Sequence, residues 1–336
     1  MEKRGVFLYE YATCGSIHDI PPSMAVEGLG MFKALERGFS ACGRTSTFID
    51  PEVELFPGYP RHKFSDEIFL EFVQEAEECL IIAPESEGIL LRLTRLLEKS
   101  GRPNLGSSSR GIRIAGDKYA TYKRIKSFSP KTEIYKGGTS LSFPLVAKPR
   151  DGVSGEGIVF LKEEDALAKV PRGYVIQEYV PGRPMSAAFI VGDEVNLLSV
   201  NTQELEGFEY VGAKLPVEGV DTEPLFKSLE KIKGLHGYVG VDFIYDSDSD
   251  VKIIEVNPRP TTPVAAYQRA YGVNVAELLL RNYHGKPLPE IRKRSPVHLL
   301  KTPRKMVDSY ISFNGYSLIL RDWNEGAGLG HRRGKH

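Results

Sequence analysis

The sequence has few cysteines, no net charge and no long apolar run, and each absence excludes a class of protein. Its three cysteines are odd in number and far apart, which indicates reduced thiols in a cytoplasmic protein: Cys14, Cys42 and Cys79. The 44 basic and 44 acidic residues of the 336-residue chain cancel, so no net field favours nucleic acid or an anionic membrane. No apolar run approaches the roughly 18 residues of a membrane span. We therefore expect small-molecule partners. The sequence leaves open whether the protein forms a homo-oligomer.

Several nucleotide-binding and catalytic motifs are also missing. The pattern G-x-x-x-x-G-K-[ST] is absent, which excludes a P-loop NTPase. No glycine fingerprint follows the first predicted strand, which argues against a dinucleotide-dependent oxidoreductase. The seven histidines have no metal-ligand spacing, and no Ser/His/Asp or Cys/His signature indicates a covalent nucleophile.

The first third of the chain alternates predicted strands with predicted helices. Strands are predicted at 5–12, 45–50 and 79–84, and helices at 23–43, 65–79 and 86–101. This order predicts a parallel, doubly wound sheet whose ligands lie at the carboxyl ends of the strands. Those ends carry Glu10 and the stretch 85–87.

From Asp117 the pattern changes. A basic helix is predicted at 117–128, and longer strands dominate beyond residue 184, with helices near 224–234 and 263–283. This part is typical of an α+β fold with an antiparallel sheet. The tail "GAGLGHRRGKH" is rich in glycine and basic residues and is expected to be flexible.

The stretch "GYVGVDFIYDSDSDVKIIEVNPRP" predicts a hairpin with strands at 236–245 and 251–257. Pairing across its turn brings Asp242 opposite Glu255 to within about one pair, and Asn257 faces the same side as Glu255. Two carboxylates and an amide oxygen are hard ligands that suit Mg²⁺ or Mn²⁺ rather than zinc. Solvated acids on a half-exposed strand are the alternative. The prolines at 258 and 260 hold Arg259 beside these ligands.

A phosphate site is predicted at "AKPRDGVSGEGIVF". Lys148 ends a strand and precedes a loop that contains Gly152, Gly155 and Gly157. Glycines let backbone N–H groups approach phosphate oxygens, and a lysine adds a point charge. Lys118, on the basic helix, is a second cation for this site. A plain β-turn and a solvated lysine are the alternatives.

Taken in order, "DK" at 117–118, "VAKPRDGVSGEGI", "IQEYVPG", "GVDF" and "EVNPRP" resemble the ATP-grasp superfamily of carboxylate–amine ligases. The resemblance implies an ATP-grasp fold of mixed α/β and α+β class. It implies an N-terminal α/β substrate domain at 1–116 and a small lid domain at 117–182. A C-terminal domain with the metal site would follow at 183–290, and a C-terminal extension with a flexible tail at 291–336.

The resemblance also assigns roles to residues. The ATP phosphates would contact two lysines and the loop at 151–157: Lys118, Lys148, Gly152, Ser154, Gly155 and Gly157. Adenine would bind at Glu178, Tyr179 and Val180. Asp242, Glu255 and Asn257 would hold two Mg²⁺ or Mn²⁺ ions, and Arg259 with Lys148 would act on the transferred phosphoryl group. The family's acidic residue for the ribose is missing from "PGRPMSAAF", so Arg183 or a backbone carbonyl is expected instead.

A narrower resemblance rests on "FLYEYATCGSI", "AVEGLGMFKAL" and "IIAPESEGIL". These stretches resemble the archaeal ATP-grasp ligases that join L-glutamate to tyramine in methanofuran biosynthesis. The implied product is γ-glutamyltyramine, with ADP and phosphate released. Four acids become candidates for holding the tyramine ammonium, although each also fits an ordinary strand end or helix start: Glu10, Glu27, Glu85 and Glu87. The alternatives are a ligase for another amino acid or amine, and a nucleotide-binding regulator without catalysis.

Overall fold

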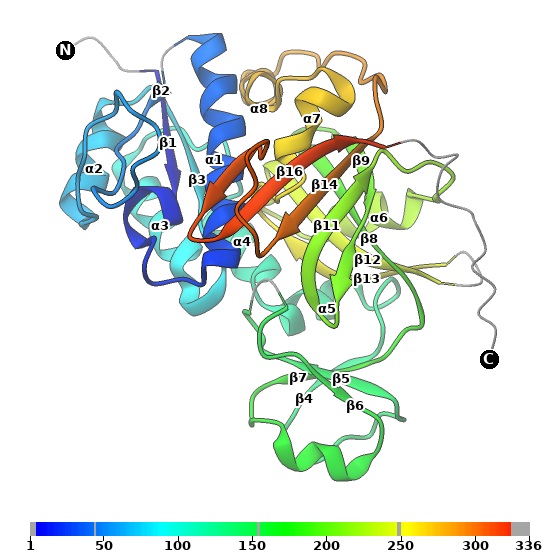
Figure 1. The fold of residues 1–336 in the computed structure, drawn as a ribbon. Helices are drawn as coiled ribbons and strands as arrows, with labels where there is room; N and C mark the ends of the chain where they lie inside the picture. Colours follow the sequence, from blue (N-terminus) through cyan, green and yellow to red (C-terminus); the bar gives the residue numbers. More distant parts are fainter. Residues whose placement is uncertain (1–4, 44, 153–154, 247–249, 324–336) are drawn as a thin grey trace.

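The computed structural model describes residues 5–43, 45–152, 155–246 and 250–323 (Figure 1). Its N-terminal part holds a parallel sheet in the order β2-β1-β3, formed by β1 (Val6–Glu10), β2 (Thr45–Ser46) and β3 (Glu78–Ile82). The predicted parallel sheet is therefore present, but the strand predicted at 45–50 is only two residues long. A short π-helical turn (Ala12–Ser16) follows β1, and a 3₁₀ turn (Ser86–Gly88) follows β3.

The helices of this part are α1 (Pro22–Cys42), α2 (Asp66–Glu75), α3 (Ile89–Ser100) and α4 (Ser109–Ala115). Ser65 caps α2 by accepting a hydrogen bond from the backbone N–H of Ile68 at 3.2 Å. Gly101 ends α3 with φ of 72°, the left-handed conformation that glycine adopts without strain. Both ends agree with the sequence signals.

A small antiparallel sheet in the order β4-β7-β5-β6 extends away from the rest of the molecule in Figure 1. Its strands are β4 (Thr132–Ile134), β5 (Leu145–Lys148), β6 (Val159–Leu161) and β7 (Val175–Glu178). Helix α5 (Lys118–Ile125) precedes it, and a 3₁₀ helix (Glu164–Lys169) connects β6 to β7. The sheet has a hydrophobic cluster of its own, which includes Leu145, Leu161 and Ile176.

A second antiparallel sheet, in the order β13-β12-β8-β9, carries the predicted metal hairpin. It consists of β8 (Gly182–Val191), β9 (Val195–Thr202), β12 (Gly237–Asp246) and β13 (Val251–Asn257). The helices of this part are α6 (Glu223–Leu229), α7 (Val264–Tyr271) and α8 (Val275–Tyr283). Gly272, at φ of 67°, ends α7, so the region predicted as helical at 263–283 contains two helices.

The third antiparallel sheet runs β10-β11-β14-β16-β15. It joins β10 (Glu204–Glu206) and β11 (Glu209–Leu215) to β14 (Val297–Thr302), β15 (Ile311–Phe313) and β16 (Tyr316–Asp322). Strand β14 pairs with β11, so the predicted C-terminal extension is built into a sheet with strands from earlier in the chain. The glycine-rich tail lies outside the described residues.

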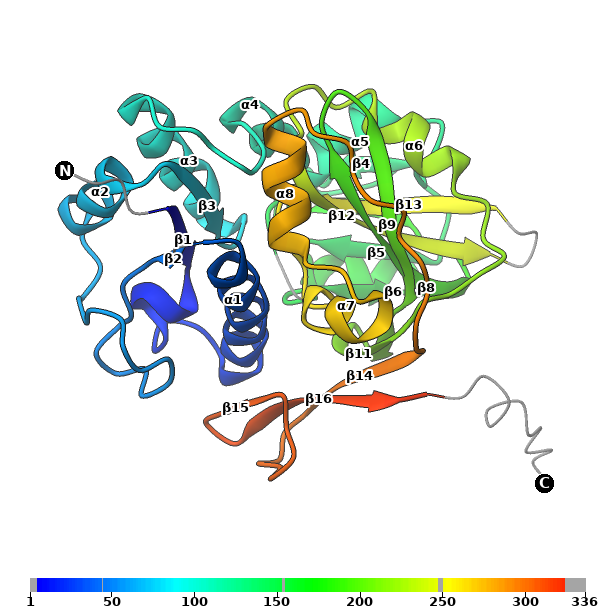
Figure 2. The same ribbon diagram turned by 90° about the horizontal axis from the view of Figure 1, so that it is seen from above.

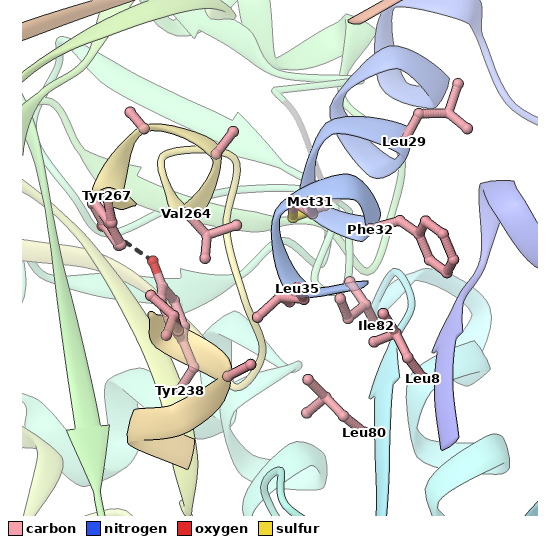
Figure 3. Packing of buried hydrophobic residues seen from close by; sticks show 14 of the residues in the cluster. Leu8, Leu29, Met31, Phe32, Leu35, Leu80, Ile82, Tyr238, Val264 and Tyr267 are labelled. Atoms are coloured by element: carbon pink, nitrogen blue, oxygen red, sulfur yellow. Dashed lines mark hydrogen bonds between the residues drawn. The ribbon is translucent and has the colours of Figure 1, made fainter. Parts of the chain in front are cut away.

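Helix α1 is shared between the two halves of the molecule. In Figure 2 it lies between the β1–β3 sheet and helices α7 and α8. Figure 3 shows Phe32 of this helix on the side of Leu8 and Ile82, and Leu35 on the side of Val264. One cluster of buried residues accordingly includes Leu8 of β1, Leu35 of α1 and Tyr267 of α7. This common core sets the position of the β1 and β3 ends relative to the metal hairpin. No helix in the described part is long and apolar enough to cross a membrane.

Replacing Asn274 by alanine is expected to destabilise the protein by about 2 kcal/mol. Its side chain accepts hydrogen bonds from the N–H groups of Ala276 and Glu277 and donates one to the carbonyl of Gly38 at 2.9 Å, which ties α8 to α1. Ser65→Ala is the control, because it removes a helix cap without a second tie and should cost about 1 kcal/mol. Urea unfolding measures both, and an equal or smaller loss for Asn274→Ala would contradict the role of this tie.

Candidate active site

One cavity of about 370 Å³ contains most of the predicted site residues. It begins between the small β4–β7 sheet and the metal hairpin and ends against β1 and α1. The predicted residues in its wall are Glu10, Glu27, Lys148, Gly155, Glu178, Tyr179, Val180, Asp242, Glu255, Asn257 and Arg259. Nucleotide-binding and substrate-binding candidates therefore share one space.

The three predicted metal ligands converge in this wall. Asp242 on β12 pairs directly with Glu255 on β13, which is the predicted register, and a β-bulge follows Asp242. The Asn257 amide Nδ2 donates to Asp242 Oδ2 at 3.2 Å, which leaves the amide oxygen for another partner. In the described part of the chain no three His, Cys, Asp or Glu side chains gather, so a cation here would be held by two acids and an amide.

The charges at this hairpin are unevenly shared. Burial, followed by the charge of Glu255, raises the pKa of Asp242 to about 7. Burial opposes ionisation of Glu255 as well, but Lys118 and Lys148 outweigh it and hold the pKa of Glu255 below its usual value. The Lys118 Nζ lies 3.0 Å from Glu255 Oε2, which explains why the negative charge resides on Glu255. Two carboxylates and an amide are hard oxygen donors of the kind that fit a divalent cation.

Lys118 is held by two contacts. Asp117 caps α5 by accepting from the N–H groups of Tyr119 and Ala120, which places Lys118 in the first turn. The Lys118 backbone N–H donates to the carbonyl of Arg150 at 2.9 Å, and its Nζ donates to the carbonyl of Gly152 at 2.6 Å. This lysine therefore lies between the metal hairpin and the start of the glycine loop.

Lys148 is buried at the end of β5. Burial, and then the charge of Lys118, lowers the pKa of Lys148 to about 7. Its Nζ donates to Gln177 Oε1 at 2.7 Å, and Gln177 donates in turn to Thr132 Oγ1 at 2.8 Å. In the sequence, Gln177 stands out only as a polar residue in an otherwise apolar strand, which does not indicate that it contacts Lys148. A bound phosphate would restore the charge of this lysine.

The glycine loop approaches the β10–β11 hairpin closely. Gly155 and Gly157 have φ of 78° and 71°, and a Cβ on Gly155 would come within 2.0 Å of the Phe208 carbonyl oxygen. Glycine is therefore required at 155 for both conformation and space. Strand β6 follows the loop and pairs with β5. Ser154 lies outside the described residues.

The adenine candidates lie at the far end of the cavity. The Tyr179 N–H already donates to the Pro144 carbonyl at 3.2 Å, so the Tyr179 carbonyl and the Val180 N–H are the backbone groups left for a base. Glu178 accepts a hydrogen bond from the Lys131 N–H at 3.1 Å. Arg183 does not line the cavity and instead lies over the Tyr245 ring, 5.8 Å from its centroid. Ser186, which pairs with Asp242 across β8 and β12, and Gln203 also line the cavity.

Arg259 is fixed by a residue from the other half of the chain. Its Nε and Nη2 donate to the same oxygen of Glu85, at 3.1 and 2.9 Å; Glu85 is buried, and the Arg259 side chain is 14% exposed. Glu85 was predicted as an ammonium ligand; its Oε2 accepts from this arginine, its Oε1 is buried without a hydrogen-bond partner in the described structure, and Glu85 does not line the cavity. Glu87 is also not part of the cavity; it lines a separate groove along α3, and its N–H donates to Asp151. The roles of both acids toward the amine stay predictions.

Glu10 and Glu27 are the predicted acids that remain in the cavity. Glu10 accepts hydrogen bonds from the N–H groups of Ala12 and Thr13 at 3.1 and 2.8 Å, and burial raises its pKa. Glu27 forms an ion pair of 2.8 Å with Lys301 of β14 and accepts a hydrogen bond from Thr262. Among the described ion pairs none includes Glu10, so its charge has no cationic partner in contact.

Sequence reasoning missed Lys301 and Tyr210. Lys301 has 3% of its side chain exposed, and its Nζ lies 5.9 Å from the centroid of the Tyr210 ring. The Tyr210 hydroxyl is buried without a hydrogen-bond partner in the described structure, although Tyr210 lines the cavity. Burial, and then the charge of Glu27, raises the pKa of Tyr210 well above its usual value, so the hydroxyl keeps its proton. A lysine inside an alternating strand was the only local signal.

Comparison with known proteins places this site in a family. An ATP-grasp domain model matches residues 115–263, and a pre-ATP-grasp 3 domain model matches residues 51–112. A tyramine–L-glutamate ligase from Methanocaldococcus fervens is 31% identical over 298 residues, which is 84% of this chain and 95% of that protein. The chain belongs to the tyramine–L-glutamate ligase family of the ATP-grasp superfamily. It is an ATP-grasp carbon–nitrogen ligase.

Solved structures agree with this family assignment. An ATP-grasp superfamily protein from Archaeoglobus fulgidus has a TM-score of 0.81 and 33% identity, covering 96% of this chain and all of that one (100%). The biotin carboxylase domain of a 2-oxoglutarate carboxylase from Hydrogenobacter thermophilus, solved with MgADP, has a TM-score of 0.68 at 15% identity, covering 90% of this chain and 76% of its own. The second likeness concerns the fold alone. As an ATP-grasp ligase, the chain uses ATP and a divalent metal.

Glu255→Gln is expected to reduce ADP formation by at least about a hundredfold, because it removes a charged ligand from the metal and leaves phosphate charge uncompensated. Glu277→Gln is the control, since it removes an equally sized carboxylate from an exposed ion pair with Arg281 on α8. Coupled detection of ADP with increasing Mg²⁺ measures both variants. Wild-type rates for Glu255→Gln would contradict the metal assignment.

Divalent metal affinity is expected to fall as the pH falls through about 7, because the raised pKa of Asp242 lets a proton compete with the metal. Below that pH the apparent Mn²⁺ affinity should drop by up to about tenfold per pH unit. Lys148 gains its proton in the same range and acts in the same direction. Asp242→Asn should therefore bind Mn²⁺ more weakly and with a shallower pH slope. Titration of free Mn²⁺ in the presence of ADP measures this, and a flat wild-type profile would contradict it.

Proposed function

We propose that the chain couples the side-chain carboxylate of L-glutamate to tyramine and releases ADP and phosphate. The observation that carries the proposal is the single cavity that joins the metal and phosphate residues to Glu10 and Glu27 at the N-terminal end. The relative from Methanocaldococcus fervens, which is named for these two substrates and aligns over nearly its whole length, supports the choice of acid and amine.

The first step forms an acyl phosphate. A glutamate carboxylate oxygen attacks the γ-phosphorus of ATP, and the bond to the β-phosphate oxygen of ADP breaks. Lys118 and Lys148 contact the phosphates, and Arg259 faces the transferred group from a position fixed by Glu85. Asp242, Glu255 and Asn257 would hold the divalent ions, two Mg²⁺ or Mn²⁺, and these would supply neutralisation of the phosphate charge.

The second step forms the amide. The neutral amine nitrogen attacks the acyl carbon, the bond to the phosphate oxygen breaks, and the departing phosphate takes the proton that the new amide nitrogen loses. Before this attack, the bound ammonium must give up one proton to become neutral. Glu10 is the acceptor that the site offers for this proton, since its carboxylate is buried, lacks a cationic partner among the described residues and has a raised pKa. No side chain forms a covalent bond to the substrate.

The same region offers a place for an aromatic ring. The cavity wall near Glu10 includes apolar side chains from α1, from the residues before it and from the end of β3: Ile20, Met24, Met31, Ile82 and Pro84. An aromatic amine would place its ring on these side chains and its ammonium at Glu10. Adenine is assigned to Glu178, Tyr179 and Val180 at the opposite end of the cavity. The cytoplasmic location of the protein stays a prediction.

The proposal predicts ADP release only when glutamate and tyramine are both present, with a product of the mass of γ-glutamyltyramine. Tyrosine should be used at least about a hundredfold less well than tyramine, because its carboxylate would lie against Glu10 in a desolvated site. Glu10→Gln should raise KM for tyramine and leave KM for ATP unchanged. Initial rates with mass detection of the product test each point. Equal use of tyrosine, or of another amino acid in place of glutamate, would overturn the substrate assignment.

A further inference from the structure

We infer that Glu27 and Tyr210 bind the α-amino-acid head group of the acyl donor, and that Lys301 of the C-terminal strand β14 positions both. This inference rests on the proposed function, because it concerns how the same cavity holds an amino acid. Glu27 would accept the α-ammonium, and the Tyr210 hydroxyl would donate to the α-carboxylate. The γ-carboxylate would then extend toward Arg259 and the metal hairpin.

The first argument is the state of the Tyr210 hydroxyl. Tyr210 lines the cavity, and its hydroxyl is buried and has no hydrogen-bond partner in the described structure. An unsatisfied buried hydroxyl costs free energy, so a ligand that accepts its hydrogen bond would gain affinity. Because this hydroxyl keeps its proton, the matching ligand group is an acceptor such as a carboxylate.

The second argument is the charge arrangement around Glu27. Its carboxylate faces the cavity, yet only 11% of the side chain is exposed, and it is held by Lys301 on one oxygen and Thr262 on the other. Lys301 also lies 3.4 Å from Glu209, beside Tyr210. A buried ion pair contributes little net stability compared with apolar packing. Here it keeps a negative charge at a fixed place in a substrate cavity, where a zwitterion would meet an acid next to a hydroxyl donor.

The third argument is the position of these residues along the cavity. Thr262, which holds Glu27, lies three residues after Arg259, and the same stretch forms the wall between them. The charges of both Glu27 and Asp242 contribute to the raised pKa of Tyr210. The head-group residues therefore adjoin the site of phosphoryl transfer, as a glutamate with two methylene groups between its α-carbon and γ-carboxylate requires. Lys301 lies beyond the region matched by the ATP-grasp domain model, so this contact is supplied by the C-terminal sheet.

The test compares three acyl donors with tyramine and ATP. Glutamate has both head-group charges, 4-aminobutyrate lacks the α-carboxylate, and glutarate lacks the α-ammonium. Tyr210→Phe should raise KM for glutamate about tenfold and leave KM for 4-aminobutyrate unchanged, because only glutamate uses the hydroxyl. Glu27→Gln should raise KM for glutamate about tenfold and leave KM for glutarate unchanged. KM for ATP should stay the same in both variants.

Lys301→Met should weaken both preferences, and Lys301→Arg should restore them in part, because a positioning role needs the positive charge. Lys305→Met, at an exposed lysine in the loop after β14, is the matched control and should behave like the wild type. Tyr210→Phe leaves the ion pair in place and removes one oxygen without a partner, so it should fold even where Lys301→Met does not.

Two outcomes would overturn the inference while leaving the proposed function in place. One is an equal loss with glutamate, 4-aminobutyrate and glutarate in Tyr210→Phe and Glu27→Gln, which would indicate a structural role alone. The other is a wild type that couples 4-aminobutyrate as well as glutamate. A wild type that couples a different α-amino acid but not its decarboxylated analogue would overturn the proposed substrate and support the head-group site. A wild type that couples no α-amino acid would overturn both.

Discussion

The contact on which the rest of the site depends is the one between Arg259 and Glu85. It joins Arg259, two residues after the metal strand β13, to Glu85, three residues after β3, across 174 positions of the chain. Glu85 is buried and Arg259 largely so, and a guanidinium left there without a carboxylate would be strongly unfavourable. The pair therefore fixes the direction of Arg259 and, together with the common core around α1, holds the N-terminal sheet beside the metal hairpin.

The remaining charges are arranged around that contact. At the nucleotide end, Lys118 neutralises Glu255, and Lys148 is held by an uncharged amide, so its charge is left for phosphates. At the substrate end, Lys301 neutralises Glu27, whereas Glu10 is held by two backbone N–H groups and the Thr13 hydroxyl. Each buried charge thus has either a partner or a set of hydrogen bonds, and the two that lack an opposite charge in contact are those best placed to meet a ligand.

Local signals were sufficient for the parts of the site that lie close together in the sequence. Asp242, Glu255 and Asn257 sit on one hairpin, so strand alternation and a short turn were enough to predict their pairing. The caps at Ser65 and Gly101 are likewise local. The roles of Glu85 and Lys301 could not be predicted, because each depends on a partner more than 170 residues away, and nothing near either residue indicates which charge it meets. An acid at a strand end looks the same whether it binds an amine or an arginine.

The common core around α1 has a consequence for how molecules reach the cavity. Because β1, α1 and α7 are packed into one hydrophobic cluster, we expect the walls that contain Glu10 and Arg259 to move together. The small sheet β4-β7-β5-β6 has a separate cluster and carries Lys148 and the adenine candidates. Substrates and products are therefore expected to enter and leave the cavity on the side of that sheet. The nucleotide would then occupy the entrance, so the acid and the amine would have to arrive before it or leave after it, and turnover would follow a compulsory sequence of arrivals and departures.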